Sequence, residues 1–117
     1  MLFICYPKCS TCKKAQKFLD EHGISYEVRD IKENRPTADE LSLWIEKSGL
    51  PTKRFFNTSG ILYRSMGLSD NLAAMSDEEQ VDLLASDGML VRRPILVGDD
   101  LVLVGFKQPE WEKALGL

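Results

Sequence analysis

Two cysteines three positions apart, Cys9 and Cys12, are the residues of this chain best suited to chemistry. A thiolate is a strong nucleophile, and a second thiol within reach can displace whatever the first has bound, leaving a disulfide. Two such thiols are sufficient for thiol–disulfide exchange. In a reducing compartment, a Cys-x-x-Cys pair is more often redox-active or metal-binding than structural.

The two cysteines lie between an apolar run and a helical pattern. The run Leu2–Tyr6 is predicted to be a short buried strand. From Ser10 onward apolar residues recur at helical spacing, and Gly23 closes the segment. Cys9 should therefore lie at a helix N-terminus, where unpaired N–H groups and the helix dipole stabilise a thiolate. Cys12 falls about one turn later on the same face, within reach of the Cys9 sulfur.

The other potential ligands near this pair favour structural roles. Cys5 belongs to the apolar strand and is expected to be a buried thiol. His22 stands beside Gly23 at the end of the helix, where capping explains it. A zinc site would need two ligands beyond Cys9 and Cys12, so the sequence predicts no metal site and no bound cofactor.

Length and charge restrict the remaining possibilities. The chain has 117 residues, which predicts a single domain over 1–117. Its formal net charge of −3 gives no electrostatic reason to expect direct binding of nucleic acid or of an anionic membrane surface. The apolar start, Leu2–Tyr6, is too short for a signal peptide or a membrane span, so we expect a cytoplasmic location. Three cysteines also suit a disulfide-stapled secreted domain poorly.

The first half of the chain reads as strand, helix, strand, helix. The segment 25–29 alternates as a strand does, and 31–36 is a polar loop. Thr37 and Glu40 form a capping box that begins the next helix, which Gly49 ends.

The second half predicts short helices, then a hairpin, then a final helix. A second capping box begins at Ser76. Two β-rich runs, 95–97 and 101–104, flank a turn, and Pro109 suits the first turn of the last helix. A β-α-β unit, a helical section at about 37–87 and a β-β-α unit together describe an α/β protein: a thioredoxin-like fold with a helical insertion.

Several motifs resemble one known family. Pro7-Lys8-Cys9-Ser10-Thr11-Cys12-Lys13-Lys14-Ala15 resembles the active-site segment of the glutaredoxin-like arsenate reductase and Spx family, and Arg92-Arg93-Pro94-Ile95 looks like its Arg-Pro motif. The match continues through Asn57–Gly60, Tyr63–Leu68 and Val104–Lys107. The resemblance therefore covers essentially the whole chain.

This resemblance implies a thioredoxin-like fold, Cys9 as nucleophile and a cis-proline, Pro94, facing the active site. In arsenate reductases of this type three arginines hold the oxyanion, and the matching positions here are Arg93, Asn57 and Lys107. Lysine keeps the charge without the bidentate fork, and asparagine has no charge. Arg93 is expected to stabilise the thiolate and any bound anion, with Asn57, Pro94 and Lys107 as substrate-binding residues.

Three functions follow as hypotheses. The first is a cytosolic thiol–disulfide oxidoreductase that forms a Cys9–Cys12 disulfide and is restored by an external thiol such as glutathione, glutaredoxin or thioredoxin. The second is a redox-sensing adaptor resembling Spx, which binds RNA polymerase and not DNA. The third is an arsenate reductase that depends on glutathione and glutaredoxin.

Overall fold

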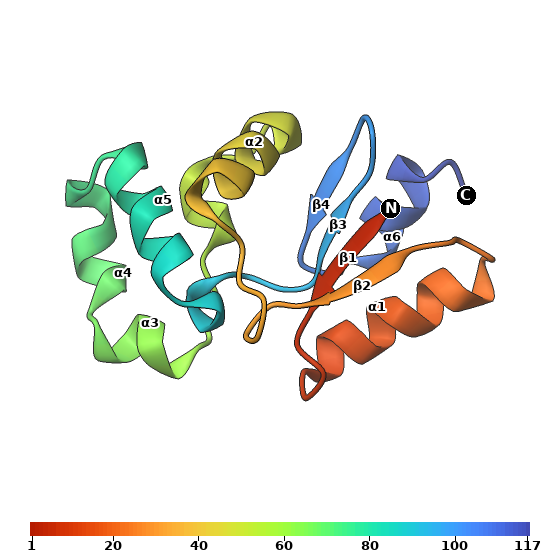
Figure 1. The fold of residues 1–117 in the computed structure, drawn as a ribbon, viewed down its shortest axis with the longest axis horizontal. Helices are drawn as coiled ribbons and strands as arrows, with labels where there is room; N and C mark the ends of the chain where they lie inside the picture. The colour runs from red at the N-terminus through yellow and green to blue at the C-terminus, as the bar shows by residue number, and fades with distance from the viewer.

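A four-stranded sheet with helices on both faces forms the centre of the protein (Figure 1), in a computed structural model that describes residues 1–117. The strands are β1 (Leu2–Cys5), β2 (Glu27–Asp30), β3 (Ile95–Val97) and β4 (Val102–Val104), in the spatial order β2-β1-β3-β4. β1 runs parallel to β2 and antiparallel to β3, and β3 and β4 form an antiparallel hairpin. This is the predicted fold: a β-α-β unit opens the chain and a β-β-α unit closes it.

The helices account for most of the remaining chain. They are α1 (Ser10–Glu21), α2 (Ala38–Ser48), α3 (Ile61–Ser65), α4 (Leu68–Asn71), α5 (Asp77–Ser86) and α6 (Gln108–Ala114), with 3-10 turns η1 (Thr52–Phe55), η2 (Leu72–Ala74) and η3 (Gly88–Leu90). Helices α2 to α5 lie between β2 and β3 in the chain, and α3 to α5 form a group beside the sheet (Figure 1), which confirms the predicted helical insertion. Both predicted capping boxes are present. No helix has both the length and the apolar composition needed to cross a membrane.

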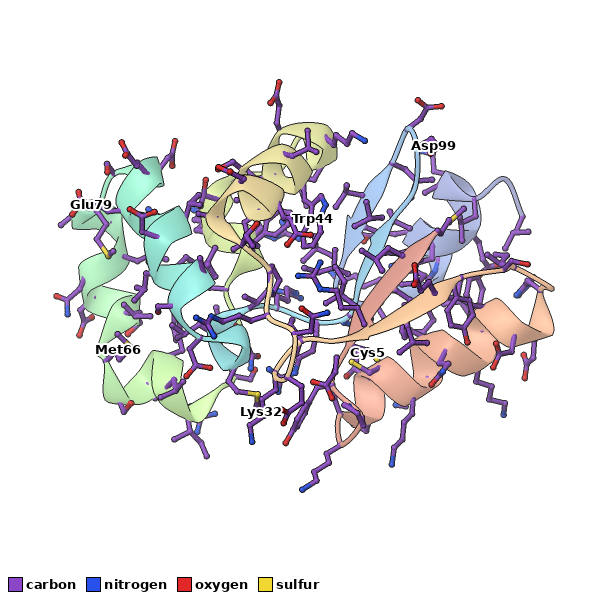
Figure 2. The ribbon with its side chains drawn as sticks, viewed as in Figure 1. Cys5, Lys32, Trp44, Met66, Glu79 and Asp99 are labelled. Carbon is purple, nitrogen blue, oxygen red and sulfur yellow. The ribbon has the colours of Figure 1, made fainter.

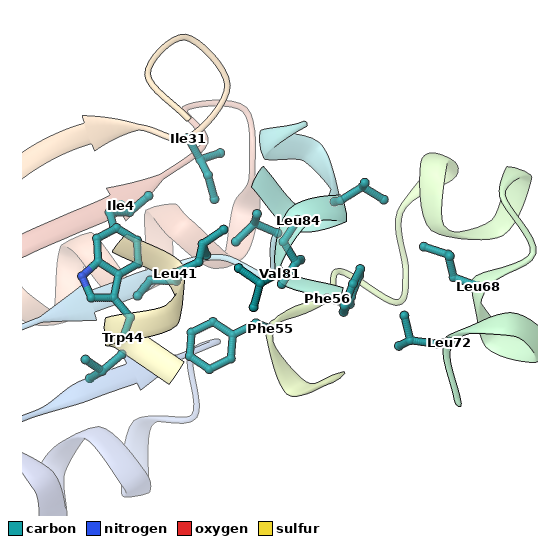
Figure 3. Packing of buried hydrophobic residues seen from close by; sticks show 14 residues of the cluster. Ile4, Ile31, Leu41, Trp44, Phe55, Phe56, Leu68, Leu72, Val81 and Leu84 are labelled. Atoms are coloured by element: carbon teal, nitrogen blue, oxygen red, sulfur yellow. The ribbon is translucent and has the colours of Figure 1, made fainter. Parts of the chain in front are cut away.

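Alternation along β1 divides the buried side chains into two clusters. Phe3 and Cys5 face α1 and α6, where they pack with Phe18 and Trp111. Ile4 points to the other face and joins the larger cluster (Figure 3), which α2 and α5 complete. The strand that leads to the cysteine pair is therefore held on both sides.

Four predicted strand limits were wrong: the end of β1, both ends of β2, which finishes at Asp30, and the start of β4, which is Val102. β1 ends at Cys5 because the next backbone N–H, that of Tyr6, donates to the sulfur of Cys12 at 3.3 Å. β2 begins at Glu27, two residues later than predicted, where it pairs with Leu2. β2 is an edge strand, so alternation of its side chains is a weak guide to its limits.

The turn that precedes Arg92 and Arg93 packs backbone against backbone. Gly88, the first residue of η3, is buried against the segment that follows β2. A Cβ atom at Gly88 would lie 1.9 Å from the carbonyl oxygen of Ile31 and 2.8 Å from its carbonyl carbon. Only glycine permits this approach.

Arg29 of β2 forms an ion pair with Glu40 of α2 and also hydrogen-bonds the loop between them. Arg29 donates to both carboxylate oxygens of Glu40, at 2.6 and 2.9 Å, and to the carbonyls of Asn34 and Arg35, at 2.8 and 3.1 Å. Its guanidinium also lies over the ring of Trp44, 5.9 Å from the centroid. Hydrogen bonds from Arg29 lower the pKa of Glu40 to about 2, against an opposing effect of burial.

Glu40→Gln should lower the free energy of unfolding at pH 7 by roughly 1–2 kcal/mol, since a charged bidentate contact is lost at a partly exposed site. The Glu40 pKa is depressed from 4.5, so its contribution is present above pH 4.5 and disappears as the pH falls towards 2. Urea unfolding at pH 7 and at acid pH measures this. Glu46→Gln, at an exposed position of the same helix, is the matched control, and equal losses in both variants would contradict the assignment.

Candidate active site

Cys9 is the N-cap residue of α1 and is partly exposed. Its backbone is extended, with φ −89° and ψ 122°, and its N–H donates to the carbonyl of Tyr6 at 2.9 Å. This bond closes the turn from β1 into the helix. The side chain is consequently held where the first N–H groups of α1 have no helical acceptor.

These surroundings make Cys9 a stronger acid than an ordinary thiol. Partial burial acts to raise its pKa, but it is outweighed by the N–H and thiol of Cys12, the Arg93 guanidinium and the N–H of Thr11, so the pKa falls below 9.0. The N–H contacts do not reach the geometry of an ordinary N-cap hydrogen bond, so they act mainly as nearby positive charge. A larger fraction of Cys9 is therefore thiolate at neutral pH.

Cys12 lies beneath Cys9 and behaves in the opposite way. It is only 2 % exposed, and burial, with a smaller effect of the Cys9 charge, raises its pKa to about 12. The N–H of Tyr6, 3.3 Å from its sulfur, partly offsets this. The pair thus combines a partly exposed thiol of lowered pKa with a buried thiol of raised pKa.

A pocket of about 760 Å³ opens over Cys9. Three of the other predicted site residues, Asn57, Arg93 and Lys107, line it together with Cys9. They come from four separate places: the start of α1, the loop after η1, the segment before β3 and the loop after β4. No carboxylate lines the pocket, so its electrostatic character is cationic.

Arg93 links the pocket to the thiolate. Arg93 contributes to lowering the pKa of Cys9. Its guanidinium lies over the ring of Tyr6, 5.3 Å from the centroid, and is 3.5 Å from the carbonyl oxygen of Met89. These contacts hold the charge next to the sulfur.

Pro94 stands between Arg93 and the start of β3. The Arg93–Pro94 peptide bond is cis, as expected, but Pro94 is buried and is not among the residues that line the pocket. Its carbonyl accepts the N–H of Gly105 at 2.8 Å, so it ties the segment before β3 to the loop after β4.

Sequence reasoning missed Arg92 as a pocket residue. Arg92 lines the pocket, as Arg93 does. The available signal was the Arg-Arg doublet itself, but neighbouring residues in an extended segment ordinarily point to opposite sides. Arg64, close in sequence to Asn57, is exposed on α3 and lies outside the pocket.

The side chains expected to be structural are placed accordingly. Cys5, the last residue of β1, is buried against α1 (Figure 2). Burial, with smaller effects of Asp30 and Cys9, raises its pKa. A ring nitrogen of His22 lies 2.8 Å from the carbonyl oxygen of Phe18 at the far end of α1. No three His, Cys, Asp or Glu side chains come close enough together to hold a metal ion.

Alkylation of Cys9 by neutral iodoacetamide should be half-maximal below pH 9.0, because the thiolate reacts and its pKa is lowered. Arg93→Gln should raise this midpoint and slow alkylation at pH 7 by about 3- to 10-fold, the effect of one charged hydrogen bond. Mass spectrometry of the Cys9 peptide against pH measures both. Arg64→Gln removes an exposed arginine outside the pocket and should leave the profile unchanged; an unmoved midpoint in Arg93→Gln would contradict the assignment.

Known proteins resemble this chain over nearly all of its length. The model of the ArsC family matches residues 5–114. The protein YusI of Bacillus subtilis, described as uncharacterized, is 49% identical over 97% of this chain and 96% of its own. The global transcriptional regulator Spx 2 of Bacillus cereus is 27% identical, covering 92% of this chain and 80% of the regulator.

Solved structures agree with this relationship. An ArsC family related protein from Bacteroides fragilis superimposes with a TM-score of 0.94 at 54% identity, over 96% of this chain and 94% of that one. A possible arsenate reductase from Streptococcus mutans gives a TM-score of 0.86 at 45% identity, over 95% of this chain and 96% of that one. Fold and sequence therefore point to the same group of proteins.

Proposed function

Because the chain belongs to the ArsC family, we propose that it is a thiol–disulfide oxidoreductase in which Cys9 attacks and Cys12 resolves. One observation carries the proposal: a partly exposed Cys9 of lowered pKa lines the cationic pocket at the start of α1, and a buried Cys12 of raised pKa follows it by three residues in the same helix. In this arrangement Cys9 can react with an incoming disulfide, whereas Cys12 stays protonated and inaccessible until the second step of the exchange.

The reaction has two steps. The Cys9 thiolate attacks one sulfur of a substrate disulfide, which forms a mixed disulfide and releases the other sulfur as a thiolate. Cys12 then loses its proton to solvent or to the released thiolate and attacks Cys9, releasing the second substrate thiolate and leaving a Cys9–Cys12 disulfide. The substrate gains two electrons, which the two cysteines supply.

The first step also prepares the second. One cause of the high Cys12 pKa is the negative charge on Cys9, and that charge is consumed when the mixed disulfide forms. The resolving thiol therefore becomes easier to ionise only after substrate has bound covalently.

The pocket residues supply charge and position in this scheme. Arg93 stabilises the Cys9 thiolate, and Asn57 and Lys107 contact the substrate. Pro94 joins the Arg93 segment to the loop before Lys107 through its hydrogen bond with Gly105. An external thiol such as glutathione, glutaredoxin or thioredoxin reduces the disulfide again, which suits a reducing cytoplasm.

Thiol titration after mild peroxide tests the proposal. Peroxide converts the Cys9 thiolate to a sulfenic acid, and Cys12 displaces water from it, so two thiols disappear together. Mass spectrometry should find the Cys9–Cys12 disulfide, a free Cys5, and full reversal by dithiothreitol. Three unchanged thiols would leave the pair with a structural role only.

A redox-sensing regulator is a second candidate, favoured by the similarity to Spx. Here the same disulfide would alter a surface that binds RNA polymerase. A pull-down of RNA polymerase with the oxidised and the reduced protein separates the two functions, since an adaptor should retain the polymerase in one redox state only.

Arsenate reduction is a third candidate, favoured by the likeness to the possible arsenate reductase of Streptococcus mutans. It requires the Cys9 thiolate to attack arsenate in the cationic pocket, with glutathione and glutaredoxin completing the cycle. Arsenate-dependent loss of thiols in the wild type, and its absence in Cys9→Ser, is the expected result for this activity.

A further inference from the structure

Arg92 lines the pocket, and no acidic side chain pairs with its guanidinium. The protein has two ion pairs, one between Lys17 and Glu21 and one between Arg29 and Glu40, and neither involves Arg92. It is half-buried, and no carboxylate lines the pocket around it. A partly buried cation without a counter-charge is a site that an anion can satisfy.

The backbone around Arg92 fixes where its side chain lies. The N–H of Arg92 donates to the carbonyl of Phe55 at 2.7 Å, which anchors this residue to η1. Its side chain rests on Gly105, where an added Cβ atom would be 2.7 Å from the guanidinium Nε. Gly105 also has a φ of +69°, and its N–H is bonded to Pro94 at 2.8 Å. The missing side chain at Gly105 therefore makes room for this guanidinium.

The two adjacent arginines have different surroundings. The Arg93 guanidinium lies over the ring of Tyr6 and close enough to Cys9 to lower its pKa. Arg92 has neither contact, and the other cation of the pocket, Lys107, is exposed. Arg93 thus stabilises the Cys9 thiolate, and Arg92 and Lys107 remain available to bind an anionic group of the substrate.

We infer that Arg92, assisted by Lys107, is a specificity-determining residue that selects disulfides carrying a carboxylate near the reacting sulfur. This inference rests on the proposed function, because it assumes that Cys9 attacks a disulfide. A pocket of about 760 Å³ has room for a small organic disulfide and is not restricted to an inorganic anion. The carboxylate lies on the Arg92 fork while the thiolate attacks the sulfur–sulfur bond beside it.

Two aromatic disulfides that differ in charge test the inference. Dithiobis-nitrobenzoate carries a carboxylate on each half, and dithiodipyridine is neutral; each releases one coloured thiol or thione when Cys9 attacks. The first attack is followed in a Cys12→Ser background, so that no second release occurs. Arg92→Gln should slow the carboxylate disulfide by about 10-fold or more and the neutral one by less than about twofold, as expected for one charged contact.

Matched variants separate a specific contact from a general loss of charge. Arg64→Gln changes the net charge equally but lies outside the pocket, so it should leave the ratio of the two rates unchanged. Arg92→Lys should restore part of the preference, because it keeps the charge without the fork. Raising the salt concentration should reduce the carboxylate rate of the unmutated pocket more than that of Arg92→Gln.

The outcomes distinguish this inference from the function on which it rests. Equal slowing of both disulfides by Arg92→Gln, or no slowing of either, overturns the role of Arg92 while Cys9 remains a nucleophile. A Cys9 that reacts with both disulfides no faster than the unfolded protein does would instead overturn the proposed function.

Discussion

Cys9→Ser should lose at least about 1,000-fold in the rate of reaction with disulfides, because a serine hydroxyl stays protonated at neutral pH and the nucleophile is removed outright. The lowered Cys9 pKa and its partial exposure make it the one cysteine able to react quickly. Stopped-flow measurement of thiolate release from a model disulfide gives the rate.

The control for this experiment is Cys5→Ala. Cys5 is buried and its pKa is raised, so removing it should leave the rate of disulfide reaction nearly unchanged. Circular dichroism of each variant checks that the fold persists. A Cys9→Ser protein that kept its rate, with the loss appearing in Cys5→Ala, would falsify the assignment of the nucleophile.

In Cys12→Ser, the rate at which Cys9 attacks a disulfide should stay within about threefold of the wild-type rate. The second attack, on the mixed disulfide, should not occur. A serine hydroxyl can replace the thiol as a hydrogen-bond donor to Cys9, so the Cys9 thiolate keeps most of its stabilisation. The mixed disulfide on Cys9 then has no neighbouring thiol to displace it. Turnover with an external thiol should fall by at least about 100-fold, since an intramolecular step becomes a bimolecular one.

Intact mass is the readout that identifies this intermediate. The Cys12→Ser protein should carry one substrate half on Cys9, whereas the wild type should carry none and be two hydrogens lighter. If the wild type also accumulated the adduct, Cys12 would not be a resolving residue, and a mechanism that relies on an external thiol would replace the one proposed.

The sequence predicted the architecture because its local signals agree with the tertiary fold. The two capping boxes, at Thr37 and Ser76, begin helices where expected, and the turn after Val97 joins an antiparallel hairpin. Only the strand ends were missed. The limit of β1 depends on a bond from Tyr6 to a sulfur in the following helix, which no local pattern records.

The site was predictable only as far as its residues lie in motifs. Cys9 and Arg93 could be identified from theirs, and the structure places both at one pocket. The contribution of Arg92 depends on Gly105, which is distant in sequence and removes a steric obstacle. Such a relationship needs the three-dimensional arrangement, since neither residue type alone predicts it.

The close packing at Gly88 has a consequence for mutations far from any reactive atom. The turn η3 leads within a few residues to Arg92 and Arg93, and its position is set by contact of Gly88 with Ile31 in the segment after β2. Even a methyl group there must push one of these two segments away. Cys9 and Cys12 would stay in place while the guanidiniums of Arg92 and Arg93 moved, so a residue with no functional group can decide whether the pocket residues come together.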